Sequence, residues 1–129
     1  KKALEMDPNS QLLKNNYAYR LANASMDLDL AESLIAQVVL RAPSESQFLD
    51  TYGWVLFQKK EYKKAKAEFE SAYAYNTNDE TIMEHLGDVY FKLNDLEKAL
   101  VWWKKAQAIE SNELLEKKIA DKKYYAPQP

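Results

Sequence analysis

The two glycines of this chain, Gly53 and Gly87, lie 34 residues apart in matching surroundings, DTYGWVLF and EHLGDVYF. Both segments have the apolar periodicity of a helix, and a glycine inside a helix costs about 1 kcal/mol relative to alanine. A chain with so few glycines is expected to place them there only where a side chain would not fit. The spacing and the matching surroundings therefore predict a repeated helical unit, with two helices in close approach at each glycine.

Further landmarks recur in register with the glycines. Small and aromatic residues of the two copies match as Ala65, Phe69 and Ala72 against Ala99, Trp103 and Ala106. An earlier, more irregular copy is marked by Lys14, Tyr17, Ala18, Leu21, Ala31, Ile35, Val38 and Pro43. Together the copies predict helices over residues 10–25, 28–42, 45–59, 61–76, 78–93 and 95–110. The side chains expected to cap these helices are Ser44 with Gln47, Thr77 with Glu80, Asp27 and Asp95.

These landmarks are similar to the tetratricopeptide repeat (TPR) pattern W-x2-L-G-x2-Y, A-x3-F, P. The chain therefore resembles the TPR family over residues 1–111. The resemblance implies an all-α fold, a right-handed superhelix of antiparallel helix pairs with three repeats and a C-terminal capping helix. The expected divisions are 1–9 (end of a second helix from a truncated preceding repeat), 10–43, 44–77 and 78–111 (repeats), 112–125 (capping helix) and 126–129 (mobile tail).

The turn between the two helices of a repeat usually holds glycine in this family. Asn94 and Lys60 stand at that position in the third and second repeats. Asparagine tolerates the left-handed backbone of such turns, whereas lysine does not adopt it readily. We therefore predict local strain at Lys60.

Composition excludes several classes of site. The chain has no cysteine, so it cannot carry a disulfide, a thiol nucleophile or a cysteine-ligated metal. Its net charge is −2, so the chain does not have the positively charged surface typical of a nucleic-acid-binding protein. No apolar run approaches the roughly 20 residues that cross a bilayer. His85 is the only histidine and has no catalytic or metal-binding pattern around it. We expect a non-enzymatic protein without a metal or cofactor, and a His85 that is partly exposed or hydrogen-bonded.

The resemblance implies a protein-interaction module that binds a peptide or a partner-protein segment in a concave groove lined by the first helix of each repeat. The groove positions carried over from the family are Asn15, Tyr19, Asn23, Asp50, Trp54, Phe57, Gln58, Glu84, Asp88, Phe91 and Lys92, with Leu12, Ala22, Gln47 and Thr81 at the remaining positions. Its aromatic members form a strip suited to apolar anchors of a peptide, and exposed Trp54 is the leading contact. Burial between repeats is the alternative for this strip.

Two other functions are to be compared with peptide binding: capture of a chaperone C-terminus and a structural role. TPR domains that clamp chaperone C-terminal carboxylates use basic and amide side chains, and Asn15 and Asn16 fit such a role. Thr81, Glu84 and His85 do not, because an acidic groove repels a carboxylate, so chaperone-tail binding is not expected. The alternative to peptide binding is a rigid spacer or an assembly scaffold in a larger complex.

The two ends of the array differ. The segment NELLEKKIADKKYY places Leu115 and Ile119 on one side, and its lysines, Lys117, Lys118, Lys122 and Lys123, form mostly a charged outer face. Of these, Lys118 and Lys122 are also placed to close one end of the groove. The N-terminal residues 1–7 provide no comparable cap, which predicts further repeats upstream in a longer, bacterial-type protein and self-association through this uncovered end. Neither the cytoplasm nor the cell envelope is indicated.

Overall fold

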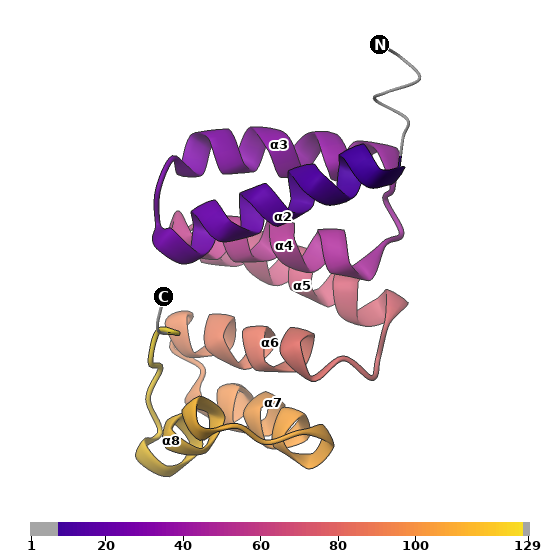
Figure 1. Cartoon of the computed structure of the whole chain (residues 1–129). Helices are drawn as coiled ribbons and strands as arrows, with labels where there is room; N and C mark the ends of the chain where they lie inside the picture. The colour runs from indigo at the N-terminus through magenta and orange to yellow at the C-terminus, as the bar shows by residue number, and fades with distance from the viewer. Residues whose placement is uncertain (1–7, 128–129) are drawn as a thin grey trace.

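The computed structural model describes residues 8–127, which form helices joined by short turns and no strand (Figure 1). The helices within this part of the chain are α2 (Pro8–Ala24), α3 (Leu28–Arg41), α4 (Ser46–Gln58), α5 (Tyr62–Tyr75), α6 (Glu80–Lys92), α7 (Leu96–Ile109) and α8 (Glu113–Asp121). The expected all-α class is confirmed. The helical stub and uncovered end expected at residues 1–7 lie outside the described residues.

Consecutive helices pack as hairpins that stack along the chain. The pairs are α2 with α3, α4 with α5, and α6 with α7, and the second helix of one pair contacts the first helix of the next. The first helices also contact one another, α2 with α4 and α4 with α6, so they form one layer (Figure 1). The short helix α8 packs on α7 and ends the stack.

The two glycines lie where the helices of a pair approach most closely, as predicted. A Cβ atom on Gly53 would lie 2.5 Å from Cε1 of Phe69 on α5, and one on Gly87 would overlap the indole of Trp103 on α7. Phe69 and Trp103 are fully buried. Each repeat therefore uses the missing side chain as space for a large ring from its second helix.

Turn geometry also agrees with the sequence. Lys60 and Asn94 both have left-handed backbones, with φ of 66° and 67°. Each lies in a turn where its own N–H and the next N–H bond back to carbonyls of the preceding helix, the pattern of a Schellman motif. The prediction of an unfavourable backbone at Lys60 is confirmed by this φ value.

Helix starts differ partly from the predicted caps. Asp95 accepts a hydrogen bond from the N–H of Lys98 and caps α7 as expected. The first helices of the later repeats begin after Glu45 and Asp79 instead of after Ser44 and Thr77, and Asp79 accepts from the N–H groups of Thr81 and Ile82. Asp27 precedes α3 without a side-chain cap bond. In the third repeat, the N-terminus of α6 is therefore capped by the carboxylate of Asp79 and not by Thr77.

No helix within residues 8–127 is both long enough and apolar enough to cross a membrane.

Candidate functional site

The layer formed by α2, α4 and α6 carries an open pocket. Its volume is about 570 Å³, and polar side chains from all three helices and from the turn before α6 surround it. The lining residues are Asn15, Asn16, Tyr19, Glu45, Ser46, Gln47, Asp50, Thr51, Asn76, Asp79 and Thr81. This part of the groove can hold a short polar segment of a partner.

Asn15, which lines this pocket, has an unused hydrogen-bond acceptor. Its side chain is only 2% exposed, and Nδ2 donates to Oδ1 of Asn16 at 3.3 Å. Its Oδ1 has no hydrogen-bond partner among the described residues. A buried acceptor left without a donor costs about 1–3 kcal/mol, so a ligand N–H at this position would recover a real loss.

Trp54 is part of the core and not an exposed contact, so its expected role in the groove is wrong. Only 1% of Trp54 is exposed, and Nε1 donates to Oδ1 of Asn23 at 2.8 Å. Its ring stacks on Phe57 and, at a centroid distance of 4.3 Å, on His85 of the next repeat. The first helix of the third repeat therefore closes over Trp54, and burial between repeats, the alternative for the aromatic strip, holds for Trp54 and Phe57.

His85 is buried beneath the pocket and hydrogen-bonded; of the two environments expected for it, partial exposure and hydrogen bonding, the structure shows the second. Its Nδ1 lies 2.8 Å from Oδ1 of Asp50, and both side chains are largely buried. Burial by itself would lower the pKa of His85, but the nearby carboxylates of Asp50 and Asp88 outweigh it, so the pKa is raised above its ordinary value. Asp50 thus lines the pocket and also forms a hydrogen bond with His85.

The predicted groove acids Glu84 and Asp88 are engaged by the capping helix. Lys118 of α8 places Nζ 2.7 Å from Oε2 of Glu84 and 2.8 Å from Oδ1 of Asp88, which also accepts from Nε1 of Trp103. Asp88 and Lys118 are each 1% exposed. Placing Lys118 on a charged outer face is therefore wrong, because it binds two of the predicted groove residues instead. Burial raises the pKa of the Asp88 carboxyl despite this lysine.

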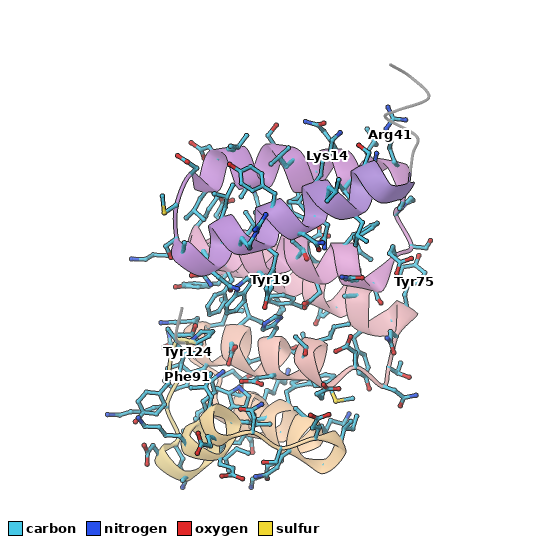
Figure 2. The ribbon with its side chains drawn as sticks, in the orientation of Figure 1. Lys14, Tyr19, Arg41, Tyr75, Phe91 and Tyr124 are labelled. Atoms are coloured by element: carbon cyan, nitrogen blue, oxygen red, sulfur yellow. The ribbon has the colours of Figure 1, made fainter. Side chains whose placement is uncertain are left out.

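The segment after α8 returns to the groove. Helix α8 ends at Asp121, because Lys122 has a left-handed backbone, so the expected helix to residue 125 is wrong. Tyr124 then packs edge-on against Phe57, with centroids 5.4 Å apart, and lies near the ammonium groups of Lys92 and Lys118. Figure 2 labels Tyr124, which lies within reach of Lys92 at the end of α6. Burial raises the pKa of Tyr124, and this end of the groove is filled by the chain itself.

The predicted groove residues therefore divide into three groups. Asn15, Tyr19 and Asp50 line the open pocket. Trp54, Phe57 and Asp88 are buried behind the groove, which corrects their expected exposure. The third group lies nearer the carboxyl ends of its helices, away from the open pocket, and comprises Asn23, Gln58, Phe91 and Lys92. The remaining predicted residue, Glu84, is bound by Lys118 of the capping helix.

Five lining residues were not predicted from the sequence: Glu45, Ser46, Thr51, Asn76 and Asp79. Two of them, Asn76 and Asp79, belong to the turn NTND, where a hydrogen-bonding and capping pattern was visible. Within residues 8–127 no cluster of three or more His, Cys, Asp or Glu side chains is arranged to hold a metal ion.

Comparison with known proteins identifies the repeats. A tetratricopeptide repeat family model matches residues 46–79 and 81–113. The chain belongs to the tetratricopeptide repeat family. These two matches cover the second and third helix pairs of the TPR array, and no curated protein is similar enough in sequence to match the chain.

Solved TPR structures share the fold at low sequence identity. The first TPR of Spaghetti (RPAP3), bound to the HSP90 peptide SRMEEVD, has a TM-score of 0.80 and 16% identity, covering 90% of this chain and 92% of that one. MamA has a TM-score of 0.76 and 20% identity, covering 94% and 71%. The Yersinia enterocolitica chaperone SycD, in complex with a peptide of the translocator YopD, has a TM-score of 0.75 and 12% identity, covering 90% and 91%. The predicted superhelical fold class is confirmed.

Proposed function

We propose that this TPR array is a protein-interaction module that binds a peptide or a partner-protein segment in its concave groove and has no catalytic activity of its own. One observation carries the proposal: the first helices surround an open pocket of about 570 Å³ lined by Asn15, whose buried Oδ1 has no donor among the described residues. A peptide backbone supplies N–H donors at regular intervals. The proposed repeats are residues 10–43, 44–77 and 78–111.

Related folds support a peptide as the ligand. The RPAP3 and SycD structures each hold a peptide, from HSP90 and from YopD respectively. The same helix arrangement is therefore able to present a groove of suitable width. We propose that the contacts in this chain are Asn15, Tyr19 and Asp50, with Trp54 and Phe57 supporting them from behind.

A chaperone-type C-terminal carboxylate is a poor ligand for this pocket. The lining residues include Glu45, Asp50 and Asp79, and no lysine, arginine or histidine. A carboxylate placed there would meet like charges. We therefore propose a different ligand class from the acidic peptide in the RPAP3 structure.

Peptide selection followed by variant binding tests the proposal. Phage display of random 12-residue peptides on the intact chain should recover binders whose affinity falls about fivefold or more in Tyr19→Ala, since truncating an aromatic contact in an interface costs about 1 kcal/mol or more. The control is Tyr75→Ala, which removes an equally large exposed ring from the end of α5. Equal binding by both variants, or recovery of no binder, would contradict the proposal.

An assembly scaffold is the second candidate, and exposed leucines favour it. In the first helix pair Leu13 is 68% exposed and Leu40 is 83% exposed. Exposed apolar side chains that form one contiguous patch often mark contact surfaces. If the array is a scaffold that associates through this pair, sedimentation will show oligomers that Leu13→Ser with Leu40→Ser abolishes, while Tyr19→Ala has no effect.

A further inference from the structure

The charge and the hydrogen-bonding pattern of the open pocket identify a narrower ligand class. Three carboxylates line it, from Glu45, Asp50 and Asp79, without a cationic side chain among the lining residues. His85 lies behind Asp50 and offsets part of that one charge. Among the described residues, no side chain forms an ion pair with Glu45 or Asp79, so the lining carries a net negative charge.

These carboxylates are held with oxygen atoms still available. Asp79 uses Oδ1 to accept from the first N–H groups of α6, and Asp50 uses Oδ1 toward Nδ1 of His85. Glu45 precedes α4 without a side-chain cap bond and is exposed. Because these bonds leave the second oxygens of Asp50 and Asp79 without a hydrogen-bond partner among the described residues, the pocket offers acceptors in fixed positions.

Asn15 provides an independent sign of a donor ligand. Asn15 lines the pocket, and its Nδ2 is turned toward Oδ1 of Asn16, which leaves its own buried Oδ1 without a partner among the described residues. A donor group entering the pocket would satisfy it. An acceptor group such as a carboxylate would not.

We propose that this pocket is a subsite for an arginine side chain of the partner peptide, an inference that rests on the proposed function. A guanidinium carries five N–H donors in a planar fork and no acceptor, which matches a wall of fixed oxygen atoms. Tyr19, 37% exposed on the pocket rim, presents a ring on which the guanidinium plane can stack. An ammonium group has neither the fork nor the plane, so lysine binds less well.

Binding of four peptide pools tests this assignment. Each pool holds blocked 12-residue peptides of random sequence with one central residue fixed as arginine, lysine, glutamate or leucine, and fluorescence anisotropy measures binding to the intact chain. The arginine pool should bind about tenfold more tightly than the glutamate pool, and this preference should shrink at high salt. It should also exceed binding of the lysine pool.

Charge variants locate the effect. Glu45→Gln with Asp79→Asn removes two carboxylates and keeps an oxygen that can cap α6, so it should reduce the arginine preference about fivefold without unfolding the chain. The matched control is Glu97→Gln with Glu110→Gln, two exposed acids at the ends of α7, which should leave the preference unchanged. Circular dichroism melting checks that both double variants are folded.

Four results would overturn the assignment. Equal binding of the arginine and glutamate pools, or an unchanged preference in the pocket variant, removes the subsite while leaving peptide binding in place. Equal binding of arginine and lysine removes the guanidinium specificity. Failure of every pool to bind the wild-type chain overturns the proposed function together with this inference.

Discussion

Trp54 of the second repeat stacks on His85 of the third, with ring centroids 4.3 Å apart and planes inclined by 15°. Asp50, one helical turn before Trp54, holds His85 through Nδ1 at 2.8 Å. The two first helices are thus joined by one stacked pair and one charged hydrogen bond beneath the pocket. This contact couples the stability of the repeat interface to the protonation of a single histidine.

The first prediction concerns pH. The folded-state pKa of His85 is raised, so its protonated form stabilises the fold fully below the unfolded value of about 6.5, and this contribution is lost as pH rises through the folded value. The difference in unfolding free energy between wild type and His85→Gln should therefore shrink from pH 6 to pH 9. Denaturant unfolding at several pH values measures it. A difference that stays constant with pH contradicts the coupling.

Trp54→Ala should destabilise the array as a whole. The indole is buried and stacked between repeats, and removing a buried tryptophan typically costs about 3–5 kcal/mol. Trp54→Phe keeps a ring against His85 but loses the bond to Asn23, and should cost less. Chemical denaturation compares the two variants. A loss below about 1 kcal/mol for Trp54→Ala would show that the ring is not a core residue.

Lys118→Met should be strongly destabilising although it replaces a lysine on a short terminal helix. It leaves Asp88 buried without its cation, and breaking one side of a buried ion pair typically costs about 3–5 kcal/mol. The control is Lys117→Met on the same helix, which removes an exposed lysine. Thermal melting of both should show a large loss for the first variant only. Equal melting temperatures would refute the buried pair.

Gly53→Ala should cost about 1–3 kcal/mol, because the added methyl group would overlap the ring of Phe69. The second variant Phe69→Leu makes room for that methyl group, so the double variant should be less unstable than the sum of the two single losses. A double-mutant cycle from urea unfolding measures this coupling. Additive losses would sink the packing explanation.

Lys60→Gly should stabilise the chain by roughly 0.5–1 kcal/mol. Glycine adopts the φ of 66° without steric cost, and this gain exceeds the entropy that glycine adds to the unfolded chain. Asn94→Gly, at φ of 67°, should gain less, since asparagine already tolerates this conformation. Melting temperatures of the two variants test the order. A destabilised Lys60→Gly would contradict it.

Much of the fold follows from residues that are local in sequence. The 34-residue register places the glycines, and with them the rings of Phe69 and Trp103, because a position in a helix fixes the direction of its side chain. The turn conformations at Lys60 and Asn94 follow from the same register. Helix ends agree with the predicted ones to within about two residues for the six repeat helices.

The site depends on contacts that no local pattern contains. Helical periodicity directs Trp54 toward the groove. Whether its ring is exposed or covered depends on how closely the next repeat packs, and here His85 covers the ring. Lys118 appears as one lysine of a charged face until α8 docks and brings it to Asp88. Tyr124 reaches Phe57 only because the chain turns back after Asp121.

Local sequence patterns therefore predict the repeat, the helix pairs and the positions where helices approach most closely. Packing between repeats sets which groove side chains are buried, which charges are paired, and which part of the concave layer remains open around Asn15. The physical reason is that direction around a helix is set by local geometry, whereas burial and pairing depend on the distance to residues about 30 positions away in the chain.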